Sequence, residues 1–298
     1  MKTKLNWSEY LISRLIVGSG YSAILFVTLI FYFLLREGFP ALWTTPPGAL
    51  FNLRWYPIEN YFGILPLITG SLVVTVIALL IAVPFGLGTA VFIAEVAPRW
   101  LREILKPLVE ILAGLPSVVL GFLGMVILSP LLRRGLNIPT GLTAFTGALL
   151  LGGIAIPTIV SVSEDALDAV PRSYRDGALA MGATPWQTIW RVTLPAARSG
   201  VLTAIMLGIG RAIGETMTVM MVTGNAPVLF HGLSTIFSPV RTMTATIAAE
   251  MGEVAKGSIH YQVLFFIGII LFLISMGVNL TASTVILKQR KRAERILS

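Results

Sequence analysis

An arginine and a glutamate stand four residues apart inside an otherwise apolar stretch of the chain. In a continuous helix, Arg211 and Glu215 would share one face. Either charge alone in lipid costs at least about 2.5–3.5 kcal/mol, so both are expected to face the interior of a helical bundle. A guanidinium offers a fork of donors that suits an oxyanion, and the carboxylate can hold it between passages. Two interpretations stay open: a structural salt bridge, or an element of an anion path.

Two polar residues near this pair are further candidates for lining such a path. Thr216 follows Glu215 directly, and Asn225 stands shortly after the same apolar stretch ends. The alternative is that each side chain only bonds to a neighbouring group, as polar residues in helices often do. We therefore predict a substrate path that includes Arg211, Glu215, Thr216 and Asn225.

Patterns that would give the chain its own chemistry are absent from the sequence. No Gly-x-x-x-x-Gly-Lys-Ser/Thr loop is present to cradle ATP phosphates, and neither Gly-x-Ser-x-Gly nor His-Glu-x-x-His occurs. With no cysteine and only two histidines, His231 and His260, a metal cluster is not expected. We expect a non-catalytic chain without a cofactor, whose energy comes from a partner or from a gradient.

The elements that position these residues are long apolar segments. Hydrophobic residues make up 55% of the 298 residues and charged residues only 12%, about half the charged share of a soluble domain. A helix needs about 20 apolar residues to cross a membrane. We predict an all-α, polytopic membrane protein with about six transmembrane helices, at Ile12–Leu35, Ile64–Phe92, Leu108–Leu132, Leu142–Ser163, Gly200–Val222 and Gln262–Leu287.

The distribution of basic residues predicts the orientation. Lysines and arginines gather in the segments that share a side with the N-terminus, which places both termini in the cytoplasm. The positive net charge of +8 is explained in this way, without nucleic acid. The basic tail 288–298 is expected to contact anionic lipid. Glu110 is expected to face the interface or a loop, or to pair with Arg102 or Lys106.

Two segments are too polar to cross the membrane. The longest cytoplasmic loop covers residues 164–198, and the longest outer loop covers residues 223–261 with a helix expected at Met243–Met251. This outer loop could form a re-entrant segment or a lid. The predicted organisation is an N-terminal part at 1–60, a transmembrane domain at 61–287 and the tail at 288–298.

The cytoplasmic loop has the pattern of a short helix, a turn and a second short helix. Ser173 is expected to cap the first helix, and Gly182 to supply the left-handed conformation that ends it. Thr184 and Pro185 are typical of the start of the next helix, which Leu194-Pro195 would end. Trp186, Ile189, Trp190 and Val192 give that helix an apolar face. Such a pair suits docking into a groove of a partner, or lying among lipid headgroups.

This loop resembles the coupling motif of ABC-importer permeases. The motif reads Glu-Ala-Ala, three residues, Gly, nine residues and Ile-x-Leu-Pro. The chain keeps both spacers and departs conservatively at the first two positions; the matching residues are Asp176, Gly177, Ala178, Gly182, Val192, Leu194 and Pro195. The resemblance implies an ABC type I importer permease fold, and a loop that inserts into a cleft of a separate ATPase subunit.

Three further stretches, at residues 110–121, 156–167 and 211–225, resemble segments of phosphate-specific importer permeases. The run from Gly214 to Met221 is similar to the PstC-type subunit, and the resemblance covers about residues 60–285. It implies transport of inorganic phosphate across the cytoplasmic membrane of a prokaryote. It also implies a homologous PstA-type permease subunit, an ATPase dimer that holds ATP and Mg, and an extracytoplasmic phosphate-binding protein. In that family the Arg and Glu at positions 211 and 215 are associated with transport.

Two alternatives remain open from the sequence. A permease for molybdate or sulfate would share the coupling loop. A gradient-driven secondary transporter would share the hydropathy, but it would have no use for a glycine-centred helix pair that ends in Leu-Pro.

Overall fold

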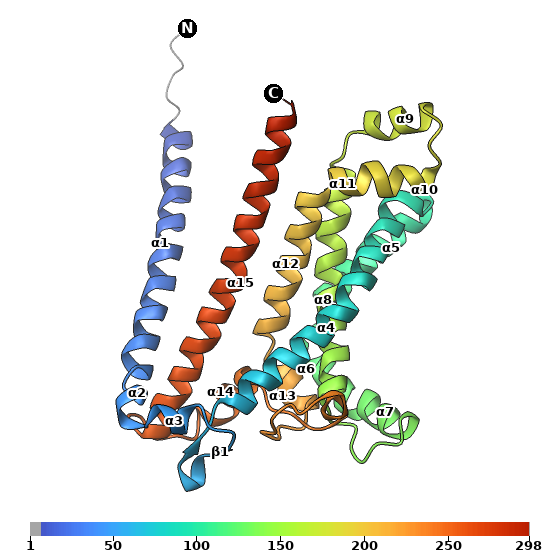
Figure 1. Cartoon of the computed structure of the whole chain (residues 1–298). Coiled ribbons are helices and arrows are strands. Elements are labelled where there is room, and N and C mark those ends of the chain that lie inside the picture. The colour runs from blue at the N-terminus through green and yellow to red at the C-terminus, as the bar shows by residue number, and fades with distance from the viewer. Residues whose placement is uncertain (1–6, 298) are drawn as a thin grey trace.

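The computed structural model describes residues 7–297, except for the side chains of residues 7–9, 47, 233, 234, 282 and 285–297. Helices dominate the described chain and run mainly along one direction (Figure 1). The start of the first helix, the end of the last helix and the predicted coupling segment all lie at the same end of the bundle (Figure 1). We call this the coupling end, and the opposite end the outer end.

Three helices form the centre of the bundle, namely α4 (Leu65–Val91), α8 (Ala144–Asp168) and α12 (Arg198–Gly214). α8 packs most extensively against α4 and then against α12. Small residues bring these backbones close together: an added Cβ at Gly86 or Gly208 would lie 2.8 or 2.6 Å from the Ile159 side chain. α4 continues into a π-helical turn, η2 (Phe92–Val96).

Two long helices stand beside this centre. α1 (Trp7–Gly38) and α15 (Ile259–Leu297) pack against one another, with Phe31 stacked on Phe272 and Phe33 edge-on to Phe265. α15 contacts α12, which joins the pair to the centre. α15 runs through residues 288–297, so this part of the predicted tail is helical. Its side chains are not described, and the lipid contact stays a prediction.

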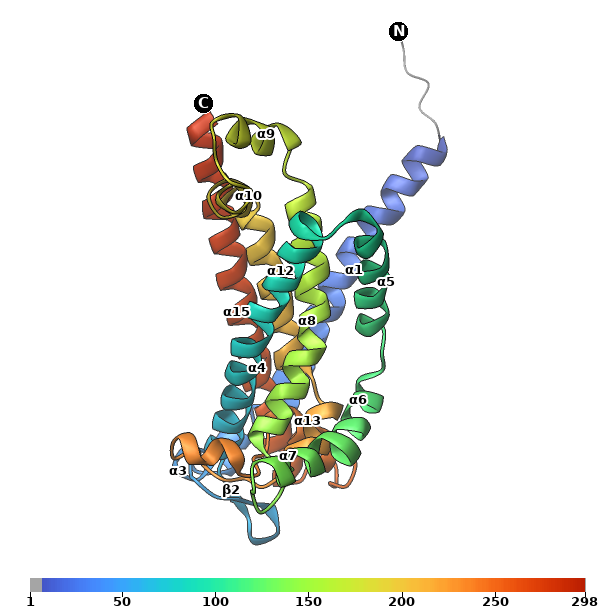
Figure 2. The same cartoon turned by 90° about the vertical axis from the view of Figure 1, so that its right-hand side faces the viewer.

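The predicted third span, Leu108–Leu132, is broken. An amphipathic helix α5 (Arg99–Ala113) ends at Gly114, and the chain restarts at Pro116 as α6 (Ser117–Leu123), η3 (Gly124–Leu128) and α7 (Ser129–Gly135). The residue before a proline avoids the helical conformation, which explains the break. Figure 2 shows α5 standing beside α8, with α6 below it.

The predicted fifth span, Gly200–Val222, is broken as well. α12 ends at Gly214, Glu215 is extended with φ −69° and ψ 128°, and α13 begins again (Met217–Val222). Within the described residues, five helices are long and apolar enough to cross a membrane, or six if Pro185–Ala196 and Arg198–Gly214, bent by 73°, count as one.

Short elements close the outer end. They are α2 (Ala41–Thr44), α3 (Pro47–Leu50), η1 (Pro57–Glu59), the hairpin of β1 (Trp55–Tyr56) and β2 (Tyr61–Phe62), η5 (Leu233–Phe237) and α14 (Met243–Glu250). α14 confirms the helix predicted in the outer loop. Residues 242–246 are buried, because α14 packs against α4, α13 and α15. The outer loop is therefore largely part of the packed bundle.

One carboxylate ties this outer loop to the hairpin. Glu250 pairs with Arg241 at 2.7 Å and with His260 at 2.7 Å, and it accepts a hydrogen bond from the indole of Trp55 at 3.2 Å. The Glu250 side chain is only 15% exposed, so its contacts are shielded from water. In such surroundings these polar contacts are stronger than in water, and they stabilise the packing of the outer loop against the hairpin.

Candidate functional site

The predicted coupling segment folds as two short helical pieces across the coupling end. α9 (Arg172–Ala180) is followed by a turn and by a second piece made of α10 (Pro185–Thr188), η4 (Ile189–Thr193) and α11 (Leu194–Ala196). The chain bends at Ala197 and enters α12. Figure 1 shows both pieces lying across the helical axes of the bundle, where a partner can reach them.

The turn between these pieces has the local chemistry that the sequence indicates. Gly182 adopts φ +85°, and its N–H donates to the Leu179 carbonyl at 2.9 Å while Ala183 donates to Ala178 at 3.1 Å. Thr184 caps the second piece through a capping box with Gln187, and Pro185 is the first helical residue. Each of these positions confirms its prediction.

The cap predicted for the first helix is wrong. Pro171 is the residue before α9, which begins at Arg172 and has no side-chain cap. Ser173 lies inside the first turn, where its hydroxyl cannot reach the free N–H groups. Proline sets the extended conformation that lets the helix start, with ψ 138° at Pro171.

The motif residues divide into an exposed group and a packed group. Asp176, Gly177, Gly182 and Pro195 are exposed, Val192 and Leu194 are half-buried, and Ala178 is 4% exposed. The exposed apolar side chains Leu179 and Met181 stand on the same segment as Asp176, and Met181 is 85% exposed. An acidic residue, a turn and apolar side chains are thus open to a partner at this end.

The tryptophan face of the second piece turns towards α4. Trp186 and Trp190 stack edge to face at 5.8 Å and, with Leu194, line an apolar groove of about 600 Å³ whose other wall runs from Pro84 to Val96. Both indoles are more than half exposed. This geometry favours the interfacial interpretation for the tryptophans, and leaves α9 and the Gly182 turn as the exposed part of the segment that the docking interpretation needs.

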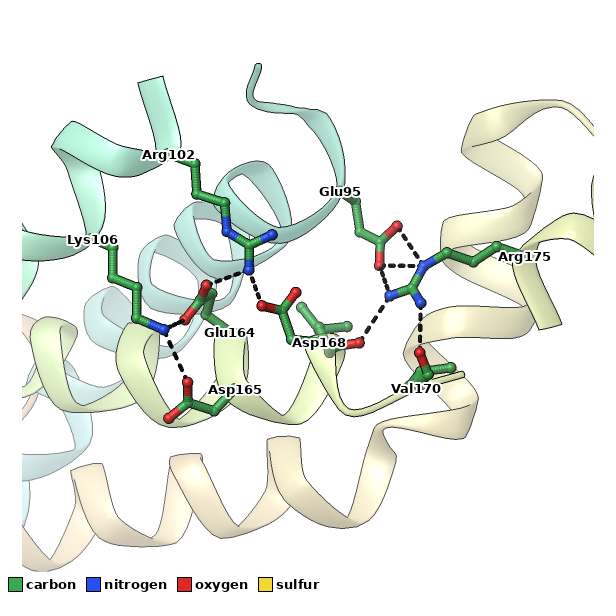
Figure 3. A network of polar contacts seen from close by, with 9 residues as sticks. Glu95, Arg102, Lys106, Glu164, Asp165, Asp168, Val170 and Arg175 are labelled. Atoms are coloured by element: carbon green, nitrogen blue, oxygen red, sulfur yellow. Dashed lines mark hydrogen bonds and ion pairs between the residues drawn. The ribbon is translucent and has the colours of Figure 1, made fainter. Parts of the chain in front are cut away.

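A network of charges lies directly beneath the coupling segment (Figure 3). Glu164, near the end of α8, is 1% exposed and accepts from Arg102 at 2.6 Å and from Lys106 at 2.7 Å. Arg102 also pairs with Asp168, and Lys106 with Asp165 at 3.1 Å. The hydrogen bond that Lys106 donates to Glu164 is the main cause of a raised pKa at Lys106, which keeps this ammonium charged.

A second ionic contact joins α9 to the end of α4. The Arg175 guanidinium donates to the Glu95 carboxylate through two nitrogens, with the closest pair of atoms 2.6 Å apart. It also donates to the carbonyls of Val170 at 2.7 Å and Leu167 at 2.9 Å. Glu95 is 8% exposed and Arg175 19%. The guanidinium therefore ties α9, η2 and the end of α8 to one another (Figure 3).

Sequence reasoning missed this network. Of the two interpretations of Glu110, an interfacial or loop-facing charge or a partner of Arg102 or Lys106, the second is wrong, because both cations reach across to α8 and Glu110 is exposed. The available signal was the acidic run Glu164-Asp165 at the end of an apolar segment, together with the basic residues that follow Pro98. Their meeting depends on how α5 folds back against α8, which periodicity does not reveal.

The charges predicted inside the membrane do not share a helical face. Arg211 sits in the last turn of α12, while Glu215 lies beyond its end. In the described structure no ion pair joins them. An Arg211 nitrogen donates a long hydrogen bond of 3.4 Å to Ala113, and Glu215 accepts from the Thr218 N–H at 3.2 Å. The continuous-helix salt bridge is therefore wrong, and the Arg211 guanidinium is exposed.

The other two path candidates lie close along the chain but bond locally. Thr216 donates to the Gly214 carbonyl at 3.2 Å. Asn225 has φ +51°, and its amide donates to the Met220 carbonyl at 2.7 Å, while its side-chain oxygen is buried without a hydrogen-bond partner. Asn225 therefore retains an acceptor that no described residue satisfies. Among the residues that the structure describes, no cluster of acids and histidines could hold a metal ion.

Comparison with known proteins places this geometry in a family. Residues 82–293 match the family described as binding-protein-dependent transport system inner membrane component. The chain is 40% identical over 233 residues to the probable ABC transporter permease protein YqgH of Bacillus subtilis (strain 168), covering 78% of this chain and 74% of the relative. It is 38% identical over 255 residues to the phosphate transport system permease protein PstC of Mesorhizobium japonicum, covering 79% and 76%.

Solved structures agree on the fold. A bacterial ABC transporter involved in the import of the acidic polysaccharide alginate matches 95% of this chain and 98% of its own, with a TM-score of 0.62 and 15% identity. The methionine transporter MetNI matches 76% and 93%, with a TM-score of 0.55 and 19% identity. The predicted fold, an all-α importer permease, is confirmed.

Proposed function

Because the chain belongs to the family of binding-protein-dependent transport system inner membrane components, we propose that it is the PstC-type subunit of an importer for inorganic phosphate. As an ABC importer permease, it works in a membrane. The observation that carries the transport role is the coupling motif, with both spacers kept, on an exposed turn at one end of a bundle of this fold. Phosphate as the substrate is supported by relatives named phosphate transport system permease protein PstC, which match 79% and 83% of this chain.

The energy comes from a separate ATPase that docks on the coupling end. The sequence has no loop of its own to cradle ATP, so ATP and Mg belong to the ATPase dimer. The exposed residues Asp176, Met181 and Gly182 form the docking surface, in which the Met181 side chain can meet an apolar cleft. The coupling end then faces the cytoplasm, together with both ends of the described chain (Figure 1).

The remaining partners follow from the fold class. A homologous PstA-type permease would complete the pathway and cover α5 and α6, which stand at one side of the bundle (Figure 2) with large apolar side chains such as Ile111 and Phe122 exposed. An extracytoplasmic phosphate-binding protein would deliver the anion to the outer end. One of the matched structures is an alginate transporter in complex with a periplasmic protein bound to an alginate pentasaccharide, which supports a binding-protein partner for this fold.

The path itself is built around Arg211. Its guanidinium is exposed at the break between α12 and α13 and makes one long hydrogen bond, so its donors are available to an oxyanion. Glu215 stands at the same break and limits how tightly an anion binds, since transport needs release as well as binding. Thr216 and Asn225 follow along the same segment and contribute hydroxyl and amide groups.

Uptake into vesicles tests the proposal. The chain, a PstA-type partner and the ATPase are reconstituted with the binding protein outside, and radiolabelled phosphate uptake is competed with sulfate and molybdate. Competition by unlabelled phosphate alone supports the assignment, whereas competition by molybdate or sulfate at equal concentration assigns another oxyanion. Arg211→Gln should leave the complex assembled and remove uptake. Normal uptake by this variant would remove Arg211 from the path.

A further inference from the structure

The two ionic contacts beneath the coupling segment form one continuous connection between helices that are far apart in sequence. The first joins Arg175 of α9 to Glu95 of η2, to the Leu167 carbonyl at the end of α8 and to the Val170 carbonyl just beyond it. The second joins Glu164, Asp165 and Asp168 of α8 to two cations of α5. We call these the α9 anchor (Glu95, Arg175) and the α5 clasp (Arg102, Lys106, Glu164, Asp165, Asp168).

The α9 anchor is built to transmit displacement. Arg175 precedes the motif residue Asp176 directly, and its planar fork bonds to Glu95 through two nitrogens. Both side chains are shielded from water, at 19% and 8% exposure. Since bidentate charged contacts of this kind fix orientation as well as distance, movement of α9 carries η2, which continues α4, and the end of α8 with it.

The α5 clasp passes that movement on. Glu164 is almost fully buried and is held from both sides, by Arg102 and by Lys106, which stand one turn apart on α5. Separating Glu164 from both cations would leave a buried, uncompensated charge, which is strongly unfavourable. α5 therefore follows the end of α8.

α5 is a rigid helix that leads to the proposed path. Its 15 residues span about 22 Å. The last of them is Ala113, whose carbonyl accepts the hydrogen bond from Arg211. Directly after Ala113, the Gly114-Leu115-Pro116 break separates α5 from α6 and gives the helix a place to pivot. Arg102 and Lys106 of the clasp stand in the first eight residues of α5, and the Arg211 contact lies at its last residue. Movement of the clasp therefore shifts the end of the helix that contacts Arg211.

We propose that the α9 anchor and the α5 clasp position Arg211 by converting movement of the coupling segment into a swing of α5. In this proposal, which rests on the proposed function, Arg102, Lys106 and Glu164 are positioning residues that touch neither the ATPase nor the anion. The free-energy coupling between nucleotide state and Arg211 runs through them.

The experiment measures the swing directly with spin labels on the assembled complex. The chain contains no cysteine, so Ile104→Cys on α5 and Leu273→Cys on α15 give one label each when the partner chains are cysteine-free. Both positions are exposed. The distance between the labels is measured without nucleotide and with a non-hydrolysable ATP analogue.

Two sets of substitutions separate the clasp from α5 as a whole. The clasp variant Arg102→Gln, Lys106→Met, Glu164→Gln removes both signs together, so that no buried charge is stranded. The matched control Arg99→Gln, Glu103→Gln removes an exposed ion pair of 3.4 Å from the same helix. Co-purification of the ATPase and its hydrolysis rate are measured for each, and phosphate uptake per ATP hydrolysed is determined.

We expect nucleotide to change the label distance in the unmodified complex and in the control, but not in the clasp variant, although the ATPase still binds and hydrolyses. Phosphate moved per ATP should fall about tenfold in the clasp variant only. A clasp variant that responds like the unmodified complex overturns the inference, and so does an unmodified complex that shows no change in distance. A clasp-dependent distance change without phosphate uptake would instead refute phosphate as the substrate and leave the inference standing.

Discussion

Replacing Gly182 by alanine tests whether the turn of the coupling segment is the part that the ATPase grips. Gly182 has φ +85°, a conformation that side chains with a Cβ rarely adopt. A Cβ built on it would meet no atom within 4 Å, so the substitution adds no steric clash. The cost comes from the backbone alone, at about 1–2 kcal/mol for a left-handed residue.

That cost converts into a loss of affinity. If the ATPase binds only the ordered turn, and the free loop relaxes to another conformation, Gly182→Ala should weaken binding by about five- to thirtyfold. The dissociation constant is measured by titrating labelled ATPase onto the two permease subunits in nanodiscs. Gly182→Asn should weaken binding less, since asparagine tolerates this conformation better than alanine.

Gly177→Ala is the matched control. Gly177 lies in α9 with helical geometry, and a Cβ there would also meet nothing within 4 Å. Alanine should stabilise α9 by about 0.5–1 kcal/mol and leave ATPase affinity equal or higher. Equal affinity for Gly182→Ala and the unmodified chain, or equal damage from both alanines, would refute the reasoning.

Further substitutions test the packing and the charges. Gly70→Ala places a Cβ against the Arg241 carbonyl and should destabilise the bundle by about 1–3 kcal/mol, seen as a lower melting temperature in detergent, whereas Gly88→Ala on the same helix meets nothing and should not lower it. Thr184→Ala removes the capping box and should cost about 1 kcal/mol, seen as faster hydrogen exchange at the amides of residues 186–188; unchanged exchange there would argue against the cap. Because the pKa of Lys106 is raised on folding, its contribution is complete below its usual pKa near 10.4 and is lost only as the pH rises through the higher folded pKa. The stability difference between the chain and Lys106→Met should therefore stay constant from about pH 6 to 9, and a steady decline across that range would contradict the contact with Glu164.

The parts of the fold that depend on local chemistry could be predicted from the sequence. Gly182, Thr184 and Pro185 form the expected turn and cap because each acts through its own backbone or its nearest neighbours. The helix predicted near Met243 is present for the same reason. Ser173 shows the limit of local reasoning, since Pro171 takes the N-cap position and the helix begins directly after it, at Arg172.

The helix breaks could not be read from hydropathy. Residues on both sides of Gly114–Pro116 and of Glu215 are apolar, so a window of 20 residues averages over each break. Pro116 indicates a possible helix break at the first site, because proline disfavours a helical residue before it. At the second site, nothing in the spacing distinguishes Glu215 from a helical residue. The interpretation of Arg211 and Glu215 as one helical pair failed for this reason.

The charge network depends on tertiary packing alone. Glu164 is buried because α5 folds back against α8, and Arg175 reaches Glu95 across 80 positions of sequence. Sequence spacing favours partners three or four residues apart, so it offers Glu110 as one possible partner of Lys106 and gives no sign of Glu164. The groups that connect the coupling segment to the proposed path are thus visible only in the folded chain.

The central claim is that the nucleotide cycle of another protein drives an anion through this bundle. The most direct test is the initial rate of radiolabelled phosphate uptake into vesicles that hold this chain and its permease partner, measured with and without the ATPase and with and without internal ATP. Uptake only when ATPase, ATP and binding protein are all present is the predicted result. Phosphate entry at the same rate with no ATPase and no nucleotide would contradict the account.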